Sequence, residues 1–286
     1  MAIFNMGSIN IDHIYTMPHL VMPGETLAAS SYQAALGGKG ANQSIAAARA
    51  GGKVIHGGMM NAADAHWLDA MAAAGVELDH ILLGEHPSGH AIVAVDEEKG
   101  ENQIILSPSS NGLIPDDLTA KILAAAAPGD WALAQNETNA TERFLTEAKA
   151  KGLKICYSAA PFVADITARI LPMVDLLIVN QIEADALAAH LGHEVSCPHL
   201  IITKGGDGAE YRGEEGAFHH EAVQVDARDT TGAGDTYLGY MLAALDQGLS
   251  IKDGMRRAGM AAAIQVTRLG ASSAIPDANE VDAALD

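Results

Sequence analysis

The distribution of apolar positions along the chain predicts an α/β protein. From about Pro115 onward, short apolar runs alternate with stretches of helical spacing; the runs are WALAQ, LKICYS, LLIVN and LIITKG. Strands that are apolar at nearly every position are typical of a parallel sheet that is buried on both faces. The pattern therefore predicts a Rossmann-like, three-layer α/β/α arrangement in which helices cover both faces of a parallel sheet.

The N-terminal third predicts a smaller sheet beside the main one. An apolar run that ends at Gly7 and Ser8 predicts a first strand, and residues 13–33 form an extended excursion after it. Residues 77–107 contain closely spaced β-type runs, which favour antiparallel strands. Because no repeat or low-complexity linker divides the chain, we expect residues 1–286 to form one domain. Its small β-sheet lid would comprise about 13–33 and part of 77–107.

Composition and charge exclude several classes of protein. Of the 286 residues, 49% are hydrophobic, which is enough for a large core and excludes a disordered chain. The formal net charge of −19 would repel nucleic acid and anionic membranes. Two cysteines, Cys156 and Cys197, cannot frame a secreted fold, and no signal or transmembrane pattern is found near the N-terminus. We therefore expect a cytoplasmic protein with no nucleic-acid or membrane partner.

The most informative stretch is DTTGAGDTYLGYMLAAL, which begins at Asp229. Gly232 and Gly234 permit a tight turn into a helix, and the N–H groups of such a turn can face an anion. Asp235 lies in the first helical turn, where a carboxylate can cap the helix. The alternative is a general base that accepts a proton from an acceptor hydroxyl beside a transferring phosphate. The long helix after the motif favours the second interpretation.

A second glycine-rich stretch, GGKGANQSIAAARAG, begins at Gly37. It has neither the spacing of a P-loop nor that of a dinucleotide fingerprint. Gly37, Gly38 and Gly40 allow the backbone to approach a ligand closely, and Asn42 lies on the first helical turn. A simple helix start on a tight turn is the alternative.

Polar residues alternate with apolar ones near the end of the first predicted strand. Asn10 and Asp12 alternate with Ile9 and Ile11, so their side chains lie on the same side of a strand. An amide and a carboxylate placed in this way can hold two neighbouring hydroxyls of a sugar. The alternative is an Asx pair that satisfies a loop.

Two later strands are also followed by candidate site residues. Asn180 and Glu183 share one face of a starting helix, where they would order a metal-bound water or form a capping pair. Thr203, Gly205 and Gly208 form a turn suited to lie beneath a nucleotide. Four histidines have no cluster of other metal ligands in the sequence and are expected on the surface: His190, His193, His219 and His220.

These motifs together resemble the ribokinase-like (PfkB) carbohydrate kinase family. The likeness extends from GSINIDHIY and PGET through GGKGANQ, NQIE, ITKGGDG and DTTGAGD to VTRLGA. It implies a Rossmann-like fold with a lid that forms a homodimer contact. It also implies transfer of the γ-phosphoryl group of Mg-ATP to the 5-hydroxyl of D-ribose. The alternatives are a kinase of the same family that acts on another sugar or a nucleoside, and a non-catalytic sugar-sensing protein.

The resemblance implies roles for individual residues. The sugar-binding positions would be Asn10, Asp12, Gly38, Lys39, Asn42 and Glu137. The positions linked to the nucleotide, to magnesium and to phosphate would be Thr203, Gly205, Gly208, Asn180 and Glu183. The anion hole would consist of Gly232, Ala233 and Gly234, with Asp235 as the base.

The resemblance further implies a potassium ion beside the anion hole, held mostly by main-chain carbonyls and one aspartate. The matching residues are Asp229, Thr231, Gln265, Arg268 and Gly270, with main-chain oxygens as ligands on the Gln265 side. Ala274 replaces a serine of this site, and Ser273 is next to it. We expect potassium to raise kcat or to lower the KM for the sugar. The alternative is that Asp229 only caps a turn.

Overall fold

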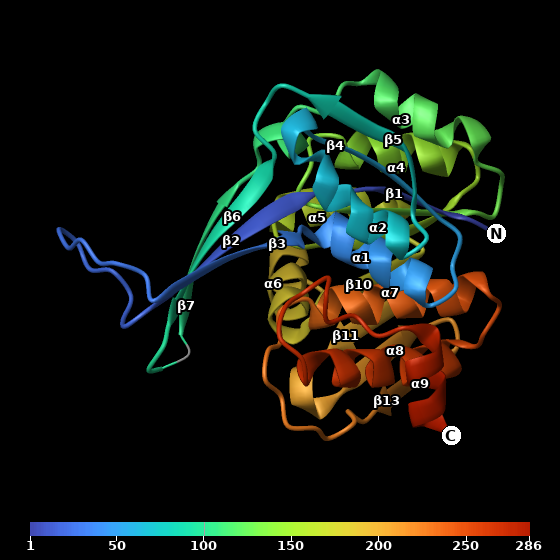
Figure 1. The fold of residues 1–286 in the computed structure, drawn as a ribbon. Coiled ribbons are helices and arrows are strands. Elements are labelled where there is room, and N and C mark those ends of the chain that lie inside the picture. Colours follow the sequence, from blue (N-terminus) through green and yellow to red (C-terminus); the bar gives the residue numbers. More distant parts are fainter. Residues whose placement is uncertain (100) are drawn as a thin grey trace.

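The computed structural model describes residues 1–99 and 101–286, and a nine-stranded sheet forms the centre of the molecule (Figure 1). Neighbouring strands follow the order β13-β12-β11-β10-β9-β8-β1-β4-β5. All pairs from β11 to β5 are parallel, and β12 and β13 form an antiparallel hairpin at one edge. The strands are β1 (Ile3–Met6), β4 (Val54–Asn61), β5 (Glu77–Gly84), β8 (Trp131–Gln135), β9 (Lys154–Ser158), β10 (Leu176–Asn180), β11 (His199–Thr203), β12 (Ala209–Gly213) and β13 (Gly216–His220).

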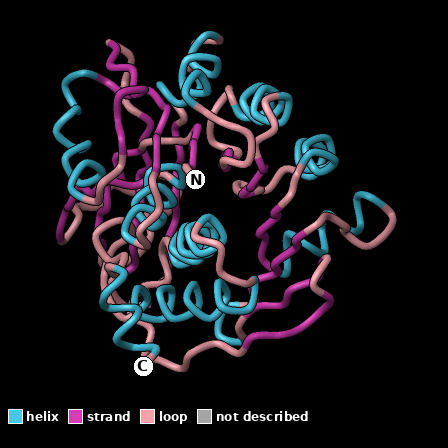
Figure 2. Tube along the Cα trace, turned by 90° about the vertical axis from the view of Figure 1, so that its right-hand side faces the viewer, coloured by secondary structure: helices cyan, strands magenta, loops and turns pink. Residues whose placement is uncertain are grey.

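Helices cover both faces of this sheet, as Figure 2 shows. One face carries α1 (Lys39–Arg49), α2 (Asp69–Ala73), α7 (Ala233–Asp246), α8 (Ile251–Val266) and α9 (Ala278–Leu285). The other face carries α3 (Asp117–Ile122), α4 (Thr141–Ala150), α5 (Ala164–Ile170) and α6 (Gln181–Leu191). Each face encloses its own apolar core, so the predicted three-layer architecture and the four predicted parallel strands β8 to β11 are confirmed. In the part of the chain that the structure describes, no helix is both long enough and apolar enough to cross a lipid bilayer.

A four-stranded sheet, called the small sheet below, projects from one end of the main sheet (Figure 1). It consists of β2 (Asn10–Met17), β3 (Ser31–Gly37), β6 (Gly89–Asp96) and β7 (Asn102–Ser107), in the order β3-β2-β6-β7. The chain leaves the main sheet at Gly7 and Ser8 and becomes extended again at Asn10. Asn10 and Asp12 therefore lie in β2 of the small sheet, and the prediction that they end the first strand was wrong.

Two further predictions about the strands were wrong. Residues 77–84 were expected among the antiparallel strands, but β5 pairs in parallel with β4 and forms an edge of the main sheet. Spacing of apolar residues does not reveal strand direction, which depends on the partner. The β12–β13 hairpin interrupts the expected alternation of strands and helices. Its turn, GEEG between Gly213 and Gly216, is a turn signal that the alternation had obscured.

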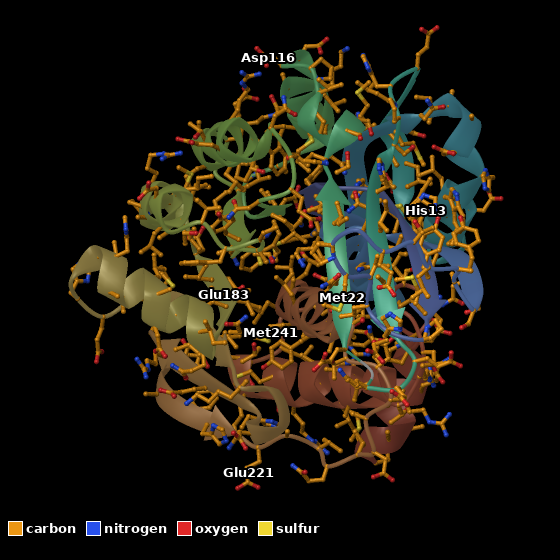
Figure 3. All side chains as sticks on the ribbon, turned by 90° about the vertical axis from the view of Figure 1, so that its left-hand side faces the viewer. His13, Met22, Asp116, Glu183, Glu221 and Met241 are labelled. Carbon is orange, nitrogen blue, oxygen red and sulfur yellow. The ribbon has the colours of Figure 1, made fainter. Side chains whose placement is uncertain are left out.

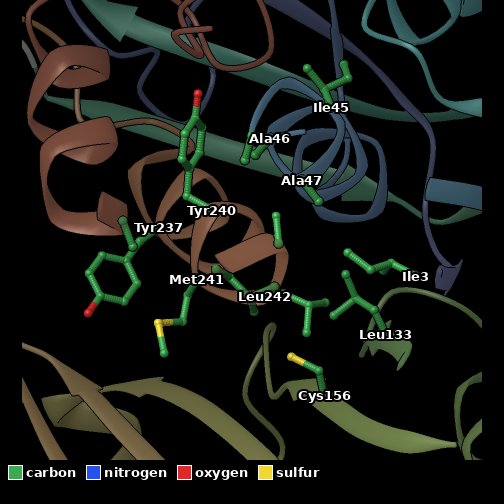
Figure 4. Packing of buried hydrophobic residues seen from close by; sticks show 14 of the residues in the cluster. Ile3, Ile45, Ala46, Ala47, Leu133, Cys156, Tyr237, Tyr240, Met241 and Leu242 are labelled. Atoms are coloured by element: carbon green, nitrogen blue, oxygen red, sulfur yellow. The ribbon is translucent and has the colours of Figure 1, made fainter. Parts of the chain in front are cut away.

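The close packing of α7 against α1 brings two helix N-termini together. Gly239 of α7 lies against α1, because a Cβ placed there would be only 2.5 Å from the Cβ of Ala46. Figure 4 shows Ala46 and Ala47 of α1 near Tyr240 and Leu242 of α7, where the two helices pack. Small residues at the crossing let the helix axes approach closely. As a result, the glycine-rich starts of α1 and α7 face the same end of the sheet.

Candidate active site

Asp235 is the meeting point of the two glycine-rich stretches. Its Oδ1 accepts a hydrogen bond from Nε2 of Gln43 (2.8 Å), and its Oδ2 accepts one from Nδ2 of Asn42 (3.1 Å). Both donors lie on α1, so the carboxylate of α7 points to the neighbouring helix. Among the described residues, no side chain caps the N-terminus of α7, whose N-cap is Gly232. Asp235 therefore does not act as the helix cap.

The turn before α7 has the conformation of an anion-binding site. Gly232 has φ = +75°, a left-handed conformation that glycine adopts without strain. The N–H of Ala233 donates to the carbonyl of Thr230 at 3.2 Å, so this one of the three predicted anion-hole donors is used within the turn. For the N–H groups of Gly232 and Gly234, the described residues provide no partner. These N–H groups and the α7 dipole can stabilise negative charge in front of Asp235.

A second acidic group, Glu137, joins the start of α1 to the main sheet. Glu137 follows β8, and its Oε2 accepts hydrogen bonds from the backbone N–H of Lys39 (3.0 Å) and from the hydroxyl of Ser8. Burial raises the pKa of Glu137, and the charge of Lys39 opposes this shift. The contact fixes the chain at the N-terminus of α1, where the predicted sugar-binding positions Gly38 and Lys39 lie.

The charges of the site perturb one another. Burial and the carboxylate of Glu137 raise the pKa of Asp12 to about 6, against the effect of Lys39. Burial also raises the pKa of Asp235, while Lys39 and the two amide hydrogen bonds favour its ionised form. Burial alone would lower the pKa of Lys39, but the surrounding carboxylates, Asp235 first, outweigh it and raise this pKa. Lys39 is thus a permanent positive charge among carboxylates, a pattern common at functional sites.

The orientation of Asn10 depends on a residue that the sequence had not singled out. Nδ2 of Asn111 donates to Oδ1 of Asn10 at 2.7 Å, and Oδ1 of Asn111 accepts from the backbone N–H of Ile9 at 3.1 Å. Asn10 is buried, with 4% of its surface exposed. Because its oxygen is occupied, its amide N–H groups remain as donors to a ligand.

A cavity of about 290 Å³ lies next to the α7 turn. Its lining includes Thr203, Gly205 and Gly208, which were predicted to contact a nucleotide, together with Gly234 of the predicted anion hole. Apolar residues form one wall: Val223, Val225, Ala262, Ala263 and Val266. The buried hydroxyl of Tyr237 has no partner among the described residues and also lines the cavity. Mostly apolar walls with a few polar groups are typical of a small-molecule site.

One histidine differs from its prediction. His220 is half-buried and lines this cavity beside Gly259, so the expectation of a surface position was wrong for His220. Sequence gave no signal of this, because β13 carries His220 to the cavity only through its pairing with β12. The described residues contain no cluster of three or more metal-ligating side chains, and His190, His193 and His219 are exposed.

Asn180 and Glu183 form a capping box at the start of α6. Oδ1 of Asn180 accepts from the N–H of Glu183 at 2.9 Å, and Oε2 of Glu183 accepts from the N–H of Asn180 at 2.8 Å. Figure 3 shows Glu183 near the end of α6 that lies toward the middle of the view. The charge of Glu183 also contributes to the raised pKa of Lys39. The capping arrangement leaves Oε1 of Glu183 available, and one carboxylate with water and phosphate oxygens is a common set of magnesium ligands.

The residues matched to a potassium site lie together, and several of their oxygen atoms accept hydrogen bonds within the protein. Oδ1 of Asp229 accepts from the N–H of Thr231, and Oδ2 accepts from the N–H of Gly270, both at 2.9 Å. These bonds lower the pKa of Asp229, although burial opposes them. Gln265 was expected to contribute its main-chain oxygen. That main-chain oxygen accepts from the N–H of Arg268 at 2.9 Å, and the side-chain Nε2 of Gln265 donates to the carbonyl oxygen of Thr231 at 2.9 Å. Arg268, whose main-chain carbonyl was also matched to potassium, lies just after the end of α8.

An acidic side chain beside a helix N-terminus, next to a cavity with apolar lining, is an arrangement suited to phosphoryl transfer to a small molecule. Residues 2–278 match the pfkB family carbohydrate kinases, so the chain belongs to this family and is an ATP-dependent carbohydrate kinase. The family resemblance drawn from the motifs is therefore confirmed.

Relatives and solved structures cover nearly the whole chain. It is 32% identical to the ribokinase of Haemophilus influenzae, over 96% of this chain and 95% of that protein. The ribokinase of Cryptococcus neoformans in complex with ADP superposes with a TM-score of 0.87 at 28% identity, covering 99% of both chains. The ribokinase of Arabidopsis thaliana, complexed with ribose and ATP, gives a TM-score of 0.87 at 25% identity, covering 100% of this chain and 99% of that one. The predicted ribokinase-like fold is confirmed.

Proposed function

We propose that the protein transfers the γ-phosphoryl group of Mg-ATP to the 5-hydroxyl of D-ribose. The observation that carries this proposal is the placement of the Asp235 carboxylate by Gln43 and Asn42, directly beside the glycine-rich turn of α7. Similarity to ribokinases over nearly the full chain supports ribose as the acceptor.

The sugar would bind between the small sheet and the start of α1. Asp12 and the amide of Asn10 would hold neighbouring hydroxyls, and Asn111 keeps the Asn10 amide turned toward them. Gly38, Lys39 and Asn42 would contact the sugar from α1, with Glu137 holding the backbone of Lys39 in place. This positioning matters because phosphoryl transfer depends mainly on the in-line alignment of acceptor and donor.

Asp235 would accept the proton of the 5-hydroxyl as the phosphoryl group moves. Burial raises its pKa, which strengthens it as a base, while Gln43 and Asn42 keep it ionised before reaction. The N–H groups of Gly232 and Gly234 and the dipole of α7 would stabilise the charge that develops on the transferring group.

ATP would occupy the cavity beside α7, with its base against the apolar wall and its phosphates directed to Gly234. Glu183, oriented by the capping box with Asn180, would hold Mg²⁺ through a water molecule. The magnesium ion, when bound, would neutralise charge on the phosphates. A potassium ion is not part of this proposal. The carbonyl of Thr231, which was matched to it, accepts a hydrogen bond from the side-chain amide of Gln265.

The small sheet would act as a lid over the sugar and as a homodimer contact. Several of its apolar side chains are exposed: Tyr32, Ile92, Ile104, Ile105 and Leu106. Side chains alternate between the two faces of a strand, so Tyr32, Ile92 and Ile105 share one face of the small sheet and Ile104 and Leu106 lie on the other. Exposed apolar side chains gathered on one face favour a protein partner, and a second copy of the chain would cover them. A cytoplasmic location is also part of the proposal, supported by two free thiols, Cys156 and Cys197.

The test is a substrate panel with coupled detection of ADP. Pentoses, hexoses and nucleosides are each assayed with Mg-ATP, and we expect the highest kcat/KM for D-ribose. A higher kcat/KM for another sugar or a nucleoside would contradict ribose as the acceptor. Tight ribose binding by calorimetry without any ADP release would instead indicate a sugar-sensing protein. Mass spectrometry of the product identifies the 5-phosphate.

A further inference from the structure

The side chain of Gln265 is a neutral amide buried beneath the anion hole. Its residue is 0% exposed, at the C-terminal end of α8. Nε2 donates to the carbonyl of Thr231 at 2.9 Å and lies 3.5 Å from the carbonyl of Ala271. Oε1 accepts from the hydroxyl of Thr236 in the first turns of α7. One side chain therefore joins α8 to the loop before α7, to the loop after α8 and to α7 itself.

The amide also contacts the backbone of the anion hole directly. A Cβ added to Gly232 would lie 2.9 Å from Nε2 of Gln265, so the amide packs against this glycine without a gap. Gly232 is the N-cap of α7, and the N–H groups of this turn would face the transferring phosphate in the proposed reaction. Any movement of Gln265 would therefore displace a donor of the anion hole.

The same contacts place N–H donors at most of the oxygen atoms matched to a cation: the Asp229 carboxylate, the Thr231 carbonyl and the main-chain carbonyl of Gln265. The matched carbonyls of Arg268 and Gly270 are the remaining ones. Both carboxylate oxygens of Asp229 accept backbone hydrogen bonds, and the Thr231 carbonyl accepts the bond from Gln265. An ion among these groups would have to lie against the amide N–H groups, which carry partial positive charge. Ala274 supplies no side-chain oxygen, and the hydroxyl of Ser273 lies close to Gly270. With N–H donors at three of the five matched residues and no side-chain oxygen at position 274, these groups are a poor set of ligands for potassium.

We propose that the side-chain amide of Gln265 takes over the bracing of the anion hole, so that potassium neither stabilises nor activates this protein. Gln265 is then a positioning residue that acts through Thr231 and Gly232. This proposal replaces the expectation of potassium activation drawn from the sequence. The expected lack of potassium activation rests on the proposed ribose kinase function, whereas the expected lack of potassium binding does not.

The first experiment uses the wild-type protein in potassium-free Tris buffer. Thermal unfolding and ribose phosphorylation are measured while KCl or choline chloride is added at equal ionic strength. We expect the two salts to give the same Tm and the same kcat. A rise in Tm or kcat with KCl beyond that with choline chloride would overturn the proposal. The Tm comparison decides the binding question even if no sugar is phosphorylated, so failure of the proposed function is recognised separately.

Two variants test the role of the amide itself. Gln265→Glu keeps the shape but replaces the N–H donors with an oxygen, and Gln265→Ala removes the group. In choline chloride we expect kcat to fall by at least about tenfold in each variant, because the anion hole loses its support. KCl should restore part of this loss and raise Tm in Gln265→Glu. Gln247→Ala, a truncation of an exposed glutamine at the end of α7, should show no salt-specific response. Folded Gln265 variants with wild-type kcat in choline chloride would overturn the proposal.

Discussion

Nε2 of Gln43 donates a hydrogen bond to Oδ1 of Asp235 at 2.8 Å, and Oε1 of the same amide also has a hydrogen-bond partner. Oε1 of Gln43 accepts a hydrogen bond from Nε2 of Gln135 at 2.8 Å, and Gln135 also donates to Oδ1 of Asn5 at 3.0 Å. Because its oxygen is engaged by Gln135, the NH₂ group of Gln43 must face Asp235. A buried polar network thus fixes the direction of the Asp235 carboxylate.

Replacing Gln43 with leucine removes the N–H donor but keeps the volume of the side chain. Hydrogen bonds to a charged group contribute about 1.5–3 kcal/mol, so kcat should fall by about ten- to a hundredfold. The bond lowers the pKa of Asp235, and its loss should raise that pKa. The acidic limb of the kcat–pH profile should therefore move to higher pH. A loss of kcat with an unmoved acidic limb would mean that Gln43 serves the fold alone.

Asp12→Ala should affect sugar and nucleotide differently. Removing a charged acceptor from sugar hydroxyls costs about 1.5–3 kcal/mol, so the KM for ribose should rise by about ten- to a hundredfold. The KM for ATP should hardly change, because Asp12 lies on β2 and not among the residues lining the nucleotide cavity. Initial-rate kinetics with each substrate varied measure this split. Equal effects on both KM values would show that Asp12 supports the structure of the whole site.

The raised pKa of Asp12 also predicts the effect of Asp12→Asn on stability. Its carboxyl titrates at about 6 in the folded state against 3.8 for its ordinary value, so the folded state binds the proton more tightly. This contribution to stability is complete below 3.8 and is lost as pH rises through 6. At neutral pH the ionised, buried carboxylate therefore costs about 1–3 kcal/mol. Asp12→Asn should raise the free energy of unfolding at neutral pH, and the gain should vanish in acid. Urea titrations across this pH range measure the free energy of unfolding of both proteins. A stability gain of Asp12→Asn that grew in acid would contradict the prediction.

The apolar surface of the small sheet predicts a self-association that one charge abolishes. Ile105 is 66% exposed on β7, and an aspartate there would have to be buried in a dimer contact without a partner. We expect sedimentation velocity to show a dimer for the wild-type protein and a monomer for Ile105→Asp. The matched control is Leu83→Asp, at an exposed position on the edge strand β5 of the main sheet. A wild-type monomer, or an Ile105→Asp dimer, would contradict the proposed contact.

The main sheet could be predicted from the sequence because the central positions of β8 to β11 are buried on both faces and are therefore apolar. The position of β5 could not, since its alternating burial fits an edge strand of either sheet. The glycine-rich motifs likewise identified Asp235 and Asn42. They did not show that Asp235 is held by residues about 190 positions away, because that contact depends on how α1 packs on α7.

Gln265 and Gln135 are polar residues in apolar stretches of the sequence, and such residues can indicate buried hydrogen bonds. Gln265 is a polar residue on the Ala-rich, core-facing side of a helix, in AAAIQV, and Gln135 ends an otherwise apolar strand. A buried amide must find hydrogen-bond partners, so both positions signalled a polar contact inside the fold. The sequence could not identify the partners, Thr231 and Gln43, which are brought near only by the tertiary structure.

The most direct test of the account is the kcat of Asp235→Asn with ribose and Mg-ATP. Asparagine keeps the size of the side chain but removes the basic oxygen, so kcat should fall by about 10²–10⁴. The Kd for ribose, measured by calorimetry, should stay close to the wild-type value. Asp69→Asn, at an exposed aspartate in the first turn of α2, controls for a general loss of negative charge and should be fully active. A kcat of Asp235→Asn within about tenfold of wild type would contradict the assignment of Asp235 as the base.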